Sequence, residues 1–380
     1  MNDQPPAGPP IRTLGASGIT VPALGIGCWP IGGPDHNLGM PMGWSTGSDE
    51  AAAIAGLETA WELGVRLFDT ADVYGHGTSE RRLGRLIAQV PRDQIVIASK
   101  VGYFAGTAPH GFDPGHMRRQ LEQSLDNLGT DRLDIYALHH QDFDEGDRLL
   151  PGAIHAMHAF KAEGLIRVIG MRGPHRFARA RLDTPPDRRG DKIARFRQVF
   201  EQVRPDVLAV RDNLLTPAAR SEGIYAFADR HRTGILINKA LGQGLLTGAY
   251  QDQSGRIFTD GDHRARKAWF TNPQALDLIR EGIRQVHALV GPEPEHLIAV
   301  ALWSCLDRYE GAAVLAGFTN PSQVRTNLAA LAFRPPRAVL QQARVIMAEV
   351  QNRLDELGEV FVDESTSPDT AAGSAATGRQ

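Results

Sequence analysis

The sequence predicts an α/β fold and favours a (β/α)8 barrel, for three reasons. Eight short apolar runs alternate with amphipathic stretches between residues 23 and 332, which is the pattern that strands and helices give in a barrel. The 380 residues are enough for one barrel. The turn after the first run lacks the GxGxxG fingerprint of an open dinucleotide-binding sheet, because Pro30 stands at the third glycine position. A doubly wound open sheet alternates strands and helices in the same way, so the pattern alone leaves it as the alternative.

The predicted strands are short runs dominated by Val, Ile, Leu and Ala. Strands buried on both faces of a parallel sheet have this composition. In chain order the eight runs are Ala23–Cys28, Arg66–Phe68, Ile95–Ser99, Leu133–Leu138, Ile166–Gly170, Val207–Val210, Gly234–Ile237 and Ala312–Leu315.

The predicted helices carry apolar residues at helical spacing between recognisable start and stop signals. The first begins at Ser48, an N-cap followed by acidic residues, and ends at Gly64. The helix Pro114–Leu128 opens with Asp-Pro and ends before Gly129. Further helices are expected at Ser79–Gln89, Ala153–Glu163, Lys192–Val203, Ser221–His231, Pro273–Leu289, Pro294–Leu306, Pro321–Ala332 and Pro336–Leu357. The last follows the eighth strand and its helix, so we expect it to pack outside the barrel.

Composition predicts a single folded domain over residues 11–358. Residues 1–10 are rich in Pro and Gly, and residues 359–380 are rich in Ser, Thr, Ala and Gly, so we expect both ends to be disordered. The start has no basic and apolar signal-peptide pattern, and no apolar run reaches the roughly 18 residues of a membrane span. A soluble, cytoplasmic protein without a membrane partner is expected.

Charge and cysteine content argue against two classes of function. The net charge is −3, whereas proteins that bind polyanions through bulk charge are basic, so we expect no nucleic-acid partner. Cys28 and Cys305 are the two cysteines, and no CxxC or Cys/His cluster is present, so neither a disulfide framework nor a metal site is predicted.

Polar residues that could carry acid/base chemistry follow three successive strands. Asp69 and Tyr74 come after the second strand, Lys100 after the third and His139 after the fourth. In a barrel these positions share the C-terminal rim, where catalytic groups gather. Each residue alone has an ordinary structural role, as a cap, a rim charge or a packing group. Together they form a complementary set, which favours an acid/base site.

The chemistry of that set suits the reduction of a carbonyl group. A neighbouring Lys100 ammonium favours the phenolate, so we expect it to lower the pKa of Tyr74 and make the phenol a better proton donor. Asp69 would pair with Lys100 and hold it in place. His139 could donate a hydrogen bond to the carbonyl oxygen.

Several motifs spread along the chain carry a family resemblance. They are Leu14-Gly-x-Ser17-Gly18 with Val21-Pro-x-Leu24-Gly25-x-Gly27; Phe68-Asp69-Thr70-Ala71-Asp72-x-Tyr74-Gly75-x-Gly77-x-Ser79-Glu80; Ala98-Ser99-Lys100; Ser124-Leu125-x-x-Leu128-Gly129-x-Asp131 followed by Leu133-Asp134-x-Tyr136-x-x-His139; Gly244-Leu245-Leu246-Thr247-Gly248; and Gly317-x-x-x-Pro321-x-Gln323-Val324-x-x-Asn327. On these motifs the chain resembles the aldo-keto reductase superfamily, especially its bacterial branch, from Leu14 to about Leu331.

The resemblance implies a TIM barrel that opens with a β-hairpin, and hydride transfer from a nicotinamide to an aldehyde or ketone. NADP (as NADPH) is the cofactor it implies first, with NAD as the alternative. Asp69, Tyr74, Lys100 and His139 take the family's tetrad positions, with Tyr74 as general acid. Cofactor contacts are expected at Gly27, Cys28, Trp29, Arg172, Lys239, Leu241, Gly244, Gly317, Gln323 and Asn327.

The chain departs from the family pattern where the nicotinamide would bind. The usual Ser-Asn after the fifth strand is Met171-Arg172, and the usual Gln on the sixth strand is Ala209. The Tyr before Asn213 is replaced, the Ser-Pro-Leu after the seventh strand is Lys239-Ala240-Leu241, and the first-strand Thr is Cys28. Side chains that recognise an amide are lost, and Arg172, Arg211, Asp212 and Lys239 enter. The predicted nicotinamide pocket is therefore atypical.

Three functions are compatible with these residues. The first is a carbonyl reductase with a rebuilt cofactor pocket, in which Arg172 or Lys239 contacts a cofactor phosphate. The second is a redox-neutral lyase, dehydratase or isomerase that moves protons without hydride. The third is a nucleotide-sensing barrel without catalysis, against which the complete tetrad argues.

Two basic loops and a set of aromatic residues complete the candidates. The Arg-rich segment 172–204 is interpreted first as a surface insertion and helix face. It could also bind an anionic substrate through bidentate arginines. The loop Asp252–Asn272 would pack over cofactor and substrate. Candidates for lining an apolar pocket are Trp29, Trp44, Tyr103, Phe104 and Trp269.

Overall fold

The computed structural model describes residues 9–106, 108–175, 190–216, 223–251 and 258–357. Eight parallel strands close into a barrel in chain order, and the last strand pairs with the first. They are β3 (Leu24–Gly27), β6 (Leu67–Asp69), β7 (Val96–Val101), β8 (Leu133–Leu138), β9 (Ile166–Arg172), β10 (Val207–Arg211), β11 (Gly234–Asn238) and β12 (Ala312–Gly317). The closure confirms the (β/α)8 barrel and excludes the open sheet.

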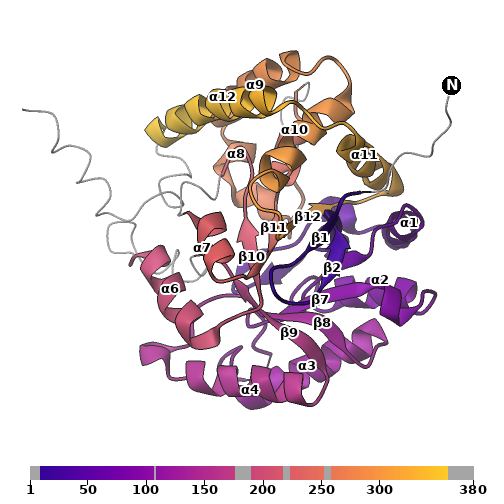
Figure 1. The fold of residues 1–380 in the computed structure, drawn as a ribbon, viewed down its shortest axis with the longest axis vertical. Coiled ribbons are helices and arrows are strands. Elements are labelled where there is room, and N and C mark those ends of the chain that lie inside the picture. Colours follow the sequence, from indigo (N-terminus) through magenta and orange to yellow (C-terminus); the bar gives the residue numbers. More distant parts are fainter. Residues whose placement is uncertain (1–8, 107, 176–189, 217–222, 252–257, 358–380) are drawn as a thin grey trace, which may run out of the picture.

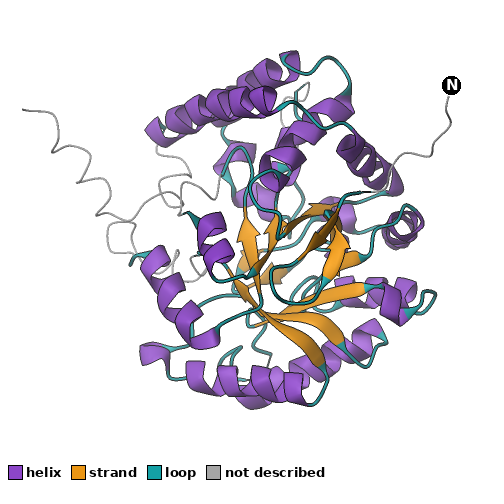
Figure 2. Cartoon of the chain, viewed as in Figure 1, coloured by secondary structure: helices purple, strands orange, loops and turns teal. Residues whose placement is uncertain are grey.

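Helices surround the barrel, as Figures 1 and 2 show. The ring consists of α1 (Glu50–Glu62), α2 (Thr78–Ile87), α3 (Pro114–Leu128), α4 (Leu150–Ala162), α6 (Lys192–Val203), α7 (Ile224–Arg230), α10 (Pro294–Leu306) and α11 (Pro321–Ala332). The helices α9 (Pro273–Ala288) and α12 (Arg337–Glu356) lie side by side at the top of Figure 1, so the predicted C-terminal helix packs outside the barrel. A short helix, α8 (Ala268–Thr271), precedes α9.

Several element boundaries differ from the predicted ones. The α1 helix is capped by Asp49, whose carboxylate accepts from the Ala52 amide, and not by Ser48. Strands β6, β7, β9, β10, β11 and β12 extend one or two residues beyond their predicted ends. In all of these except β12 the reason is that the backbone ladder continues through polar residues, which an apolar pattern cannot register. The last residues of β6, β9 and β10 are therefore Asp69, Arg172 and Arg211.

An antiparallel hairpin fills the N-terminal end of the barrel. It pairs β1 (Ile11–Thr13) with β2 (Thr20–Pro22), as the resemblance implied. Leu14, Ile19 and Val21 are buried in one cluster with interior residues of the strands. The barrel is thus packed shut at this end, and its opposite end holds the cavity described below.

Most residues of the two ends that were predicted to be disordered lie outside the described part of the chain, which omits 1–8 and 358–380. Pro10 is described, and its carbonyl accepts a hydrogen bond from the Ala23 amide at 2.6 Å, which ties it to the barrel. None of the described helices is both long and apolar enough to cross a lipid bilayer.

Candidate active site

A cavity of about 1140 Å³ opens at the C-terminal rim of the barrel. Its wall includes Asp69, Tyr74, Lys100 and His139, so the structure brings together all four residues predicted for acid/base chemistry. Side chains alternate along a strand. Two residues beyond the interior core residues Leu67 and Ala98 come Asp69 and Lys100, which therefore point inward.

Lys100 and Asp69 form a buried ion pair at the base of the cavity. The Lys100 Nζ donates to Asp69 Oδ1 at 2.7 Å and to the Thr70 carbonyl at 2.5 Å. The two side chains are only 4% and 8% exposed. Burial lowers the pKa of Lys100, but Asp69 and Tyr74 outweigh it, so the pKa lies above its ordinary value. The ammonium therefore keeps its charge in this setting.

Tyr74 lies over this pair, on the loop between β6 and α2. Its ring centroid is 4.9 Å from the Lys100 Nζ and 5.9 Å from the His139 ring. The loop is held by Gly75, whose φ is +59°, because a Cβ there would stand 2.1 Å from the Gly32 carbonyl oxygen. Only glycine fits such a close approach of two backbones.

The expected acidity of Tyr74 is wrong in its net direction. Burial raises the pKa of Tyr74 above its ordinary value, while Lys100 lowers it, Asp69 raises it and Arg172 lowers it. Lys100 acts in the predicted sense but does not outweigh the loss of water around the phenol. Tyr74 is thus a protonated phenol at neutral pH.

His139 is a neutral imidazole. Burial is the first cause that brings its pKa well below the ordinary value, and the charges of Lys100 and Arg172 add to it. Its Nδ1 is buried without a hydrogen-bond partner among the described residues. A neutral ring has one N–H, so His139 can donate one hydrogen bond and does not act as a cation.

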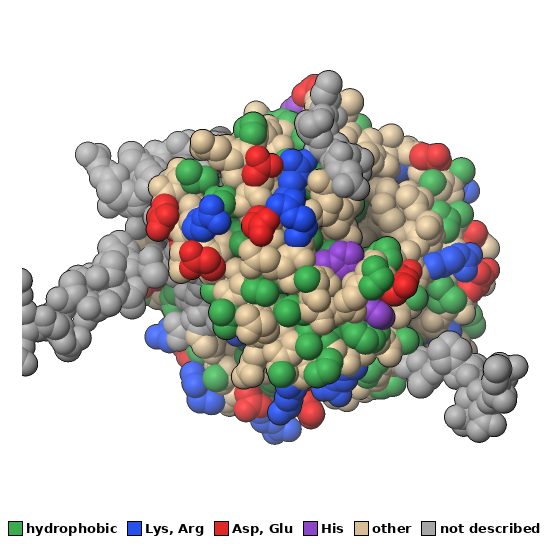
Figure 3. Space-filling view, turned by 90° about the horizontal axis from the view of Figure 1, so that it is seen from above, with side chains coloured by type: hydrophobic (Ala, Val, Ile, Leu, Met, Phe, Trp, Pro, Cys, Tyr) green, Lys and Arg blue, Asp and Glu red, His purple; other side chains and the backbone are tan. Residues whose placement is uncertain are grey.

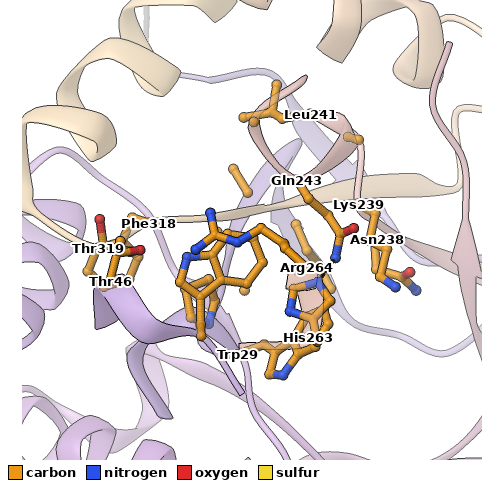
Figure 4. A pocket seen from close by; sticks show the side chains of 18 of the residues that line it. Trp29, Thr46, Asn238, Lys239, Leu241, Gln243, His263, Arg264, Phe318 and Thr319 are labelled. Atoms are coloured by element: carbon orange, nitrogen blue, oxygen red, sulfur yellow. Dashed lines mark hydrogen bonds between the residues drawn. The ribbon is translucent and has the colours of Figure 1, made fainter. Parts of the chain in front are cut away.

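Positive charge dominates the wall of the cavity. Its described lining includes Lys100, Arg172, Arg211, Lys239, Arg264, Arg266 and Lys267, whereas Asp69 is its one carboxylate. Figure 4 shows Asn238 and Lys239 on one side, Thr46 and Thr319 on the other, and Trp29, His263 and Arg264 between them.

A cover of two segments, residues 35–45 and 258–267, packs over the rim. The first includes the short hairpin of β4 (His36–Asn37) and β5 (Met40–Pro41), which the sequence did not predict. The Asp35 and Gly43 amides donate to the Gly261 carbonyl. Asp262 binds Ser45 and Arg264. Burial acts to raise the pKa of Asp262, but the Arg264 and Ser45 hydrogen bonds bring it to about 2. The cover is thus anchored by a fully ionised carboxylate.

The structure brings nearly all predicted cofactor positions to the cavity. Those that line it are Gly27, Trp29, Arg172, Lys239, Leu241, Gly244, Gly317, Gln323 and Asn327. Cys28 does not. It is fully buried, its amide donates to the Asp69 carbonyl, and its own carbonyl accepts from Ser79. Cys28 is therefore not part of the described lining of the cavity.

Asp212 stands where the resemblance implies a Tyr, and its side chain turns away from the cavity. Its carboxylate accepts from the Tyr225 hydroxyl and lies 3.6 Å from the Arg308 guanidinium. Asp212 is absent from the described lining, whereas its neighbour Arg211 is part of it. Position 212 therefore contributes no side chain to the described wall, and Arg211 is the charged residue of this pair that lines it.

Asn238 is a lining residue that the sequence analysis missed. It ends β11, two residues beyond the interior Leu236, and its Oδ1 is buried without a partner among the described residues. The sequence could have identified Asn238, because a residue two positions after an inward-pointing strand residue points into the barrel as well. His263 and Arg264 also line the cavity, and both lie in the loop Asp252–Asn272 that was expected to pack over cofactor and substrate.

Some of the basic and aromatic candidates line the cavity, some do not, and some lie outside the described residues. Residues 176–189 of the Arg-rich segment, and 252–257 of the second loop, lie outside the described residues. Arg195 on α6 pairs with Asp147 and the Gln141 carbonyl and does not line the cavity. Trp29, Trp44, Tyr103 and Trp269 line it, and Phe104 does not.

Comparison with known proteins gives a family match over most of the chain. The model of the aldo/keto reductase family matches residues 23–344. The chain is 29% identical over 335 residues to an NADH-specific methylglyoxal reductase of Escherichia coli, covering 84% of this chain and 92% of that protein. It is 28% identical over 356 residues to a D-threo-aldose 1-dehydrogenase of a Pseudomonas species, covering 87% and 96%.

Solved structures share the fold. A glycerol dehydrogenase of Gluconobacter oxydans superposes with a TM-score of 0.67 at 21% identity, covering 89% of this chain and 95% of that one. An aldo-keto reductase of Bacillus halodurans, in its holo form, gives a TM-score of 0.61 at 22% identity, covering 90% and 95%.

Proposed function

The chain belongs to the aldo/keto reductase family and is an NAD(P)H-dependent oxidoreductase, and from this premise we propose that it reduces an aldehyde or ketone with NADPH and Tyr74 as general acid. The observation that carries the proposal is the protonated Tyr74 over the buried Lys100–Asp69 pair, with neutral His139 beside it. The relatives reported above have reductase or dehydrogenase names, which favours this interpretation over a redox-neutral reaction.

The residues of the cavity fit a nicotinamide dinucleotide. About 1140 Å³ exceeds the volume of most drug-sized ligand sites. The buried Asn238 Oδ1 is an acceptor suited to the N–H of a carboxamide. The N-terminus of α11, whose dipole favours phosphate, contributes Asn320 and Ser322 to the wall. We assign Asn238, Trp29, Lys239 and the α11 residues Gln323 and Asn327 to cofactor binding.

The residues of the site perform the proton half of the reaction. The reduced nicotinamide, when bound, supplies a hydride to the carbonyl carbon. Tyr74 donates its hydroxyl proton to the carbonyl oxygen as negative charge develops there. The Lys100 ammonium, fixed by Asp69, stabilises the phenolate that is left. His139 donates a hydrogen bond to the same oxygen and orients it.

NADPH is proposed over NADH on electrostatic grounds. The 2′-phosphate of NADPH adds negative charge to a ligand whose cavity is lined by seven cationic side chains and one carboxylate. Gln323 lines the cavity, but its Oε1 already accepts from the Thr319 amide at 2.8 Å. We further propose that residues 11–358 form a single barrel domain.

Cofactor binding is expected to quench tryptophan fluorescence. Three of the five tryptophans, Trp29, Trp44 and Trp269, line the cavity. Titration with NADPH should give saturable quenching at a concentration between about 1 µM and 1 mM, and NADH should require more. Trp29→Phe should reduce the amplitude, whereas Trp61→Phe, on α1 outside the described lining, should not. Absence of quenching by both cofactors up to about 1 mM would refute the cofactor proposal.

The pH profile of reduction is expected to be flat through neutrality. Burial raises the pKa of Tyr74, so the proton donor stays protonated above the pH at which a free tyrosine ionises. Burial lowers the pKa of His139, so that side chain stays neutral down to mildly acidic pH. The kcat/KM measured from about pH 6 to pH 9 should be constant and should fall only at higher pH. A fall centred near pH 7 to 8 would contradict the assignment of Tyr74.

A further inference from the structure

A second phenol, that of Tyr103, lines the cavity beside the acid/base residues. Tyr103 comes two residues after the end of β7, and it is 8% exposed. Its ring stands edge-on to the His139 ring, with the two centroids 4.8 Å apart. Tyr74 approaches the same imidazole from another loop, at 5.9 Å. Two phenols therefore flank one histidine, and the proposed mechanism uses one of them.

The two phenols also share one apolar cluster. Tyr103 is buried in this cluster with Ala71 and Val73, which precede Tyr74 on the loop between β6 and α2. Tyr74 itself and Leu38 of the cover pack against the cluster. The ring of Tyr103 is therefore held next to the loop that carries the proton donor.

The backbone at Tyr103 is fixed from two sides. The carbonyl of the preceding Gly102 accepts a hydrogen bond from His140 Nε2 at 2.9 Å. The φ of Gly102 is +129°, and a Cβ there would stand 2.5 Å from the Phe112 ring, so glycine is required at this position. The Tyr103 carbonyl accepts from Asn37 Nδ2 of the cover at 3.0 Å. The phenol is thus held in place before any ligand binds.

The Tyr103 hydroxyl is oriented by a histidine. It forms a hydrogen bond with His175 Nε2 at 3.1 Å, and His175 also lines the cavity. Tyr103 follows β7 and His175 follows β9, so this hydrogen bond links the two loops on either side of β8, the strand that precedes His139. A phenolic hydroxyl has one donor and also accepts. Tyr103 can therefore bind both His175 and an oxygen of a ligand.

The loop that carries His175 is also fixed. Gln141, which is 5% exposed, donates through Nε2 to the Arg172 carbonyl at 2.8 Å and to the Gly173 carbonyl at 3.1 Å. The Gln141 carbonyl in turn accepts from Arg195 on α6. The Tyr103–His175 hydrogen bond therefore joins two anchored segments, as a preorganised recognition site requires.

This pair lies apart from the residues assigned to the cofactor. In the closed ring of eight strands, β8 stands opposite β12, four strands away in either direction. Gln323 and Asn327 belong to α11, which follows β12, and Trp29 follows β3, a neighbour of β12. The Tyr103–His175 pair is at the β8 side of the rim, where a substrate would meet Tyr74 and His139 without displacing the cofactor.

The outer surface gives little other basis for selecting a substrate. On the face in Figure 3, Lys and Arg are interspersed with Asp and Glu. That face therefore offers no single sign of charge that would attract one class of ligand. Selection among carbonyl compounds depends on groups inside the cavity.

We propose that Tyr103, oriented by His175, binds a second oxygen of the substrate, on the carbon next to the carbonyl. The inference rests on the proposed function and adds the substrate class, an α-hydroxy or α-oxo aldehyde or ketone. Oxygens on adjacent carbons lie close together, so two phenols that flank one imidazole ring can each bind one of them. Tyr103 is then a specificity residue that touches the substrate, and His175 is a positioning residue that acts through it.

The test compares carbonyl compounds that share a carbon skeleton and differ in the second oxygen. Butan-2-one is compared with 3-hydroxybutan-2-one and with butane-2,3-dione, and propanal with 2-hydroxypropanal. In Tyr103→Phe the ratio of kcat/KM, oxygenated over plain, should fall about 3- to 10-fold, the range for losing one neutral hydrogen bond, while kcat/KM of the plain compound changes less than about 2-fold. Comparing the ratio between variants cancels the different intrinsic reactivity of the compounds. A fall confined to the hydroxy or to the oxo compound supports the inference and identifies the oxygen that is bound.

Two variants of His175 test its positioning role. His175→Ala should reproduce most of the fall in the ratio, whereas His175→Gln keeps a hydrogen-bonding group and should restore part of it. The control is Tyr309→Phe, whose hydroxyl donates to the Thr233 carbonyl outside the described lining of the cavity, and it should leave the ratio unchanged. An equal ratio in the wild type and in Tyr103→Phe for every pair of compounds overturns the inference.

A binding measurement separates the inference from the proposed function. With saturating NADP+ present, butane-2,3-diol should raise the melting temperature of the wild type more than butan-2-ol does at equal concentration. The difference should disappear in Tyr103→Phe and persist in Tyr309→Phe. No difference between the two alcohols in the wild type overturns the inference and leaves the reductase proposal standing. A difference that depends on Tyr103, without turnover of any carbonyl compound, supports the second-oxygen site and overturns the reductase proposal.

Discussion

Replacing Tyr74 by Phe is expected to lower kcat about 10²- to 10⁴-fold, which is the range for losing a general acid. The substitution removes one hydroxyl and keeps the ring that stacks near Trp29, with ring centroids 6.1 Å apart. Cofactor affinity, measured by fluorescence quenching, should therefore change little. Steady-state kinetics on any aldehyde that the wild type reduces provides the measurement.

The matched control is Tyr309→Phe. That hydroxyl donates to the Thr233 carbonyl at 3.1 Å and lies outside the described lining of the cavity. Its loss should cost about 1 kcal/mol of stability and leave kcat unchanged. Unaltered turnover in Tyr74→Phe would show that another group delivers the proton.

Replacing Lys100 by Met is expected to damage both catalysis and stability. The side chain of Asp69 is 8% exposed and would be left as a buried carboxylate without its ion-pair partner. Breaking a buried pair on one side costs about 3–5 kcal/mol. Loss of the charge that stabilises the phenolate should lower kcat about 10²- to 10³-fold. Urea unfolding measures the loss of stability, and steady-state kinetics measures the loss of kcat.

Two further variants separate the two effects of Lys100. In the double variant Asp69→Asn/Lys100→Met no unpaired charge is buried, so most of the lost stability should return while kcat stays low. Lys161→Met is the control for the chemical change, because Lys161 is 42% exposed and its pair with Asp206 is a surface one. Such pairs contribute about 0–1 kcal/mol. A double variant that recovers activity would contradict a catalytic role for the ammonium.

The fold could be predicted because it depends on patterns that are local in sequence. Pro114–Leu128 and Lys192–Val203 were predicted at their observed bounds, since each has an Asp cap and a clear apolar stripe. The hairpin of β4 and β5 was not predicted. Its strands are two residues long, and the Gly43 and Asp35 hydrogen bonds to Gly261 join segments more than 200 residues apart. Short elements held by distant partners leave no periodic signal.

Residues of the candidate site could be predicted where a polar, reactive side chain comes at or soon after the end of a strand. Asp69, Tyr74, Lys100 and His139 all line the cavity as expected. The acidity of Tyr74 was predicted wrongly, because the sequence reveals neighbouring charges and not the loss of water around a side chain. Asn238 was missed because the apolar run was ended before it. An alternation counted from Leu236 would have found it.

The hairpin of β1 and β2 also affects the order in which ligands can bind and leave. Leu14, Ile19 and Val21 block the barrel axis at the N-terminal end, so within the described residues the axis offers no second exit. A ligand bound at the bottom of the cavity therefore leaves through the rim, past any ligand that has bound above it. If two ligands stack along the axis, we expect them to depart in the reverse sequence of their arrival, which would give a compulsory order of binding.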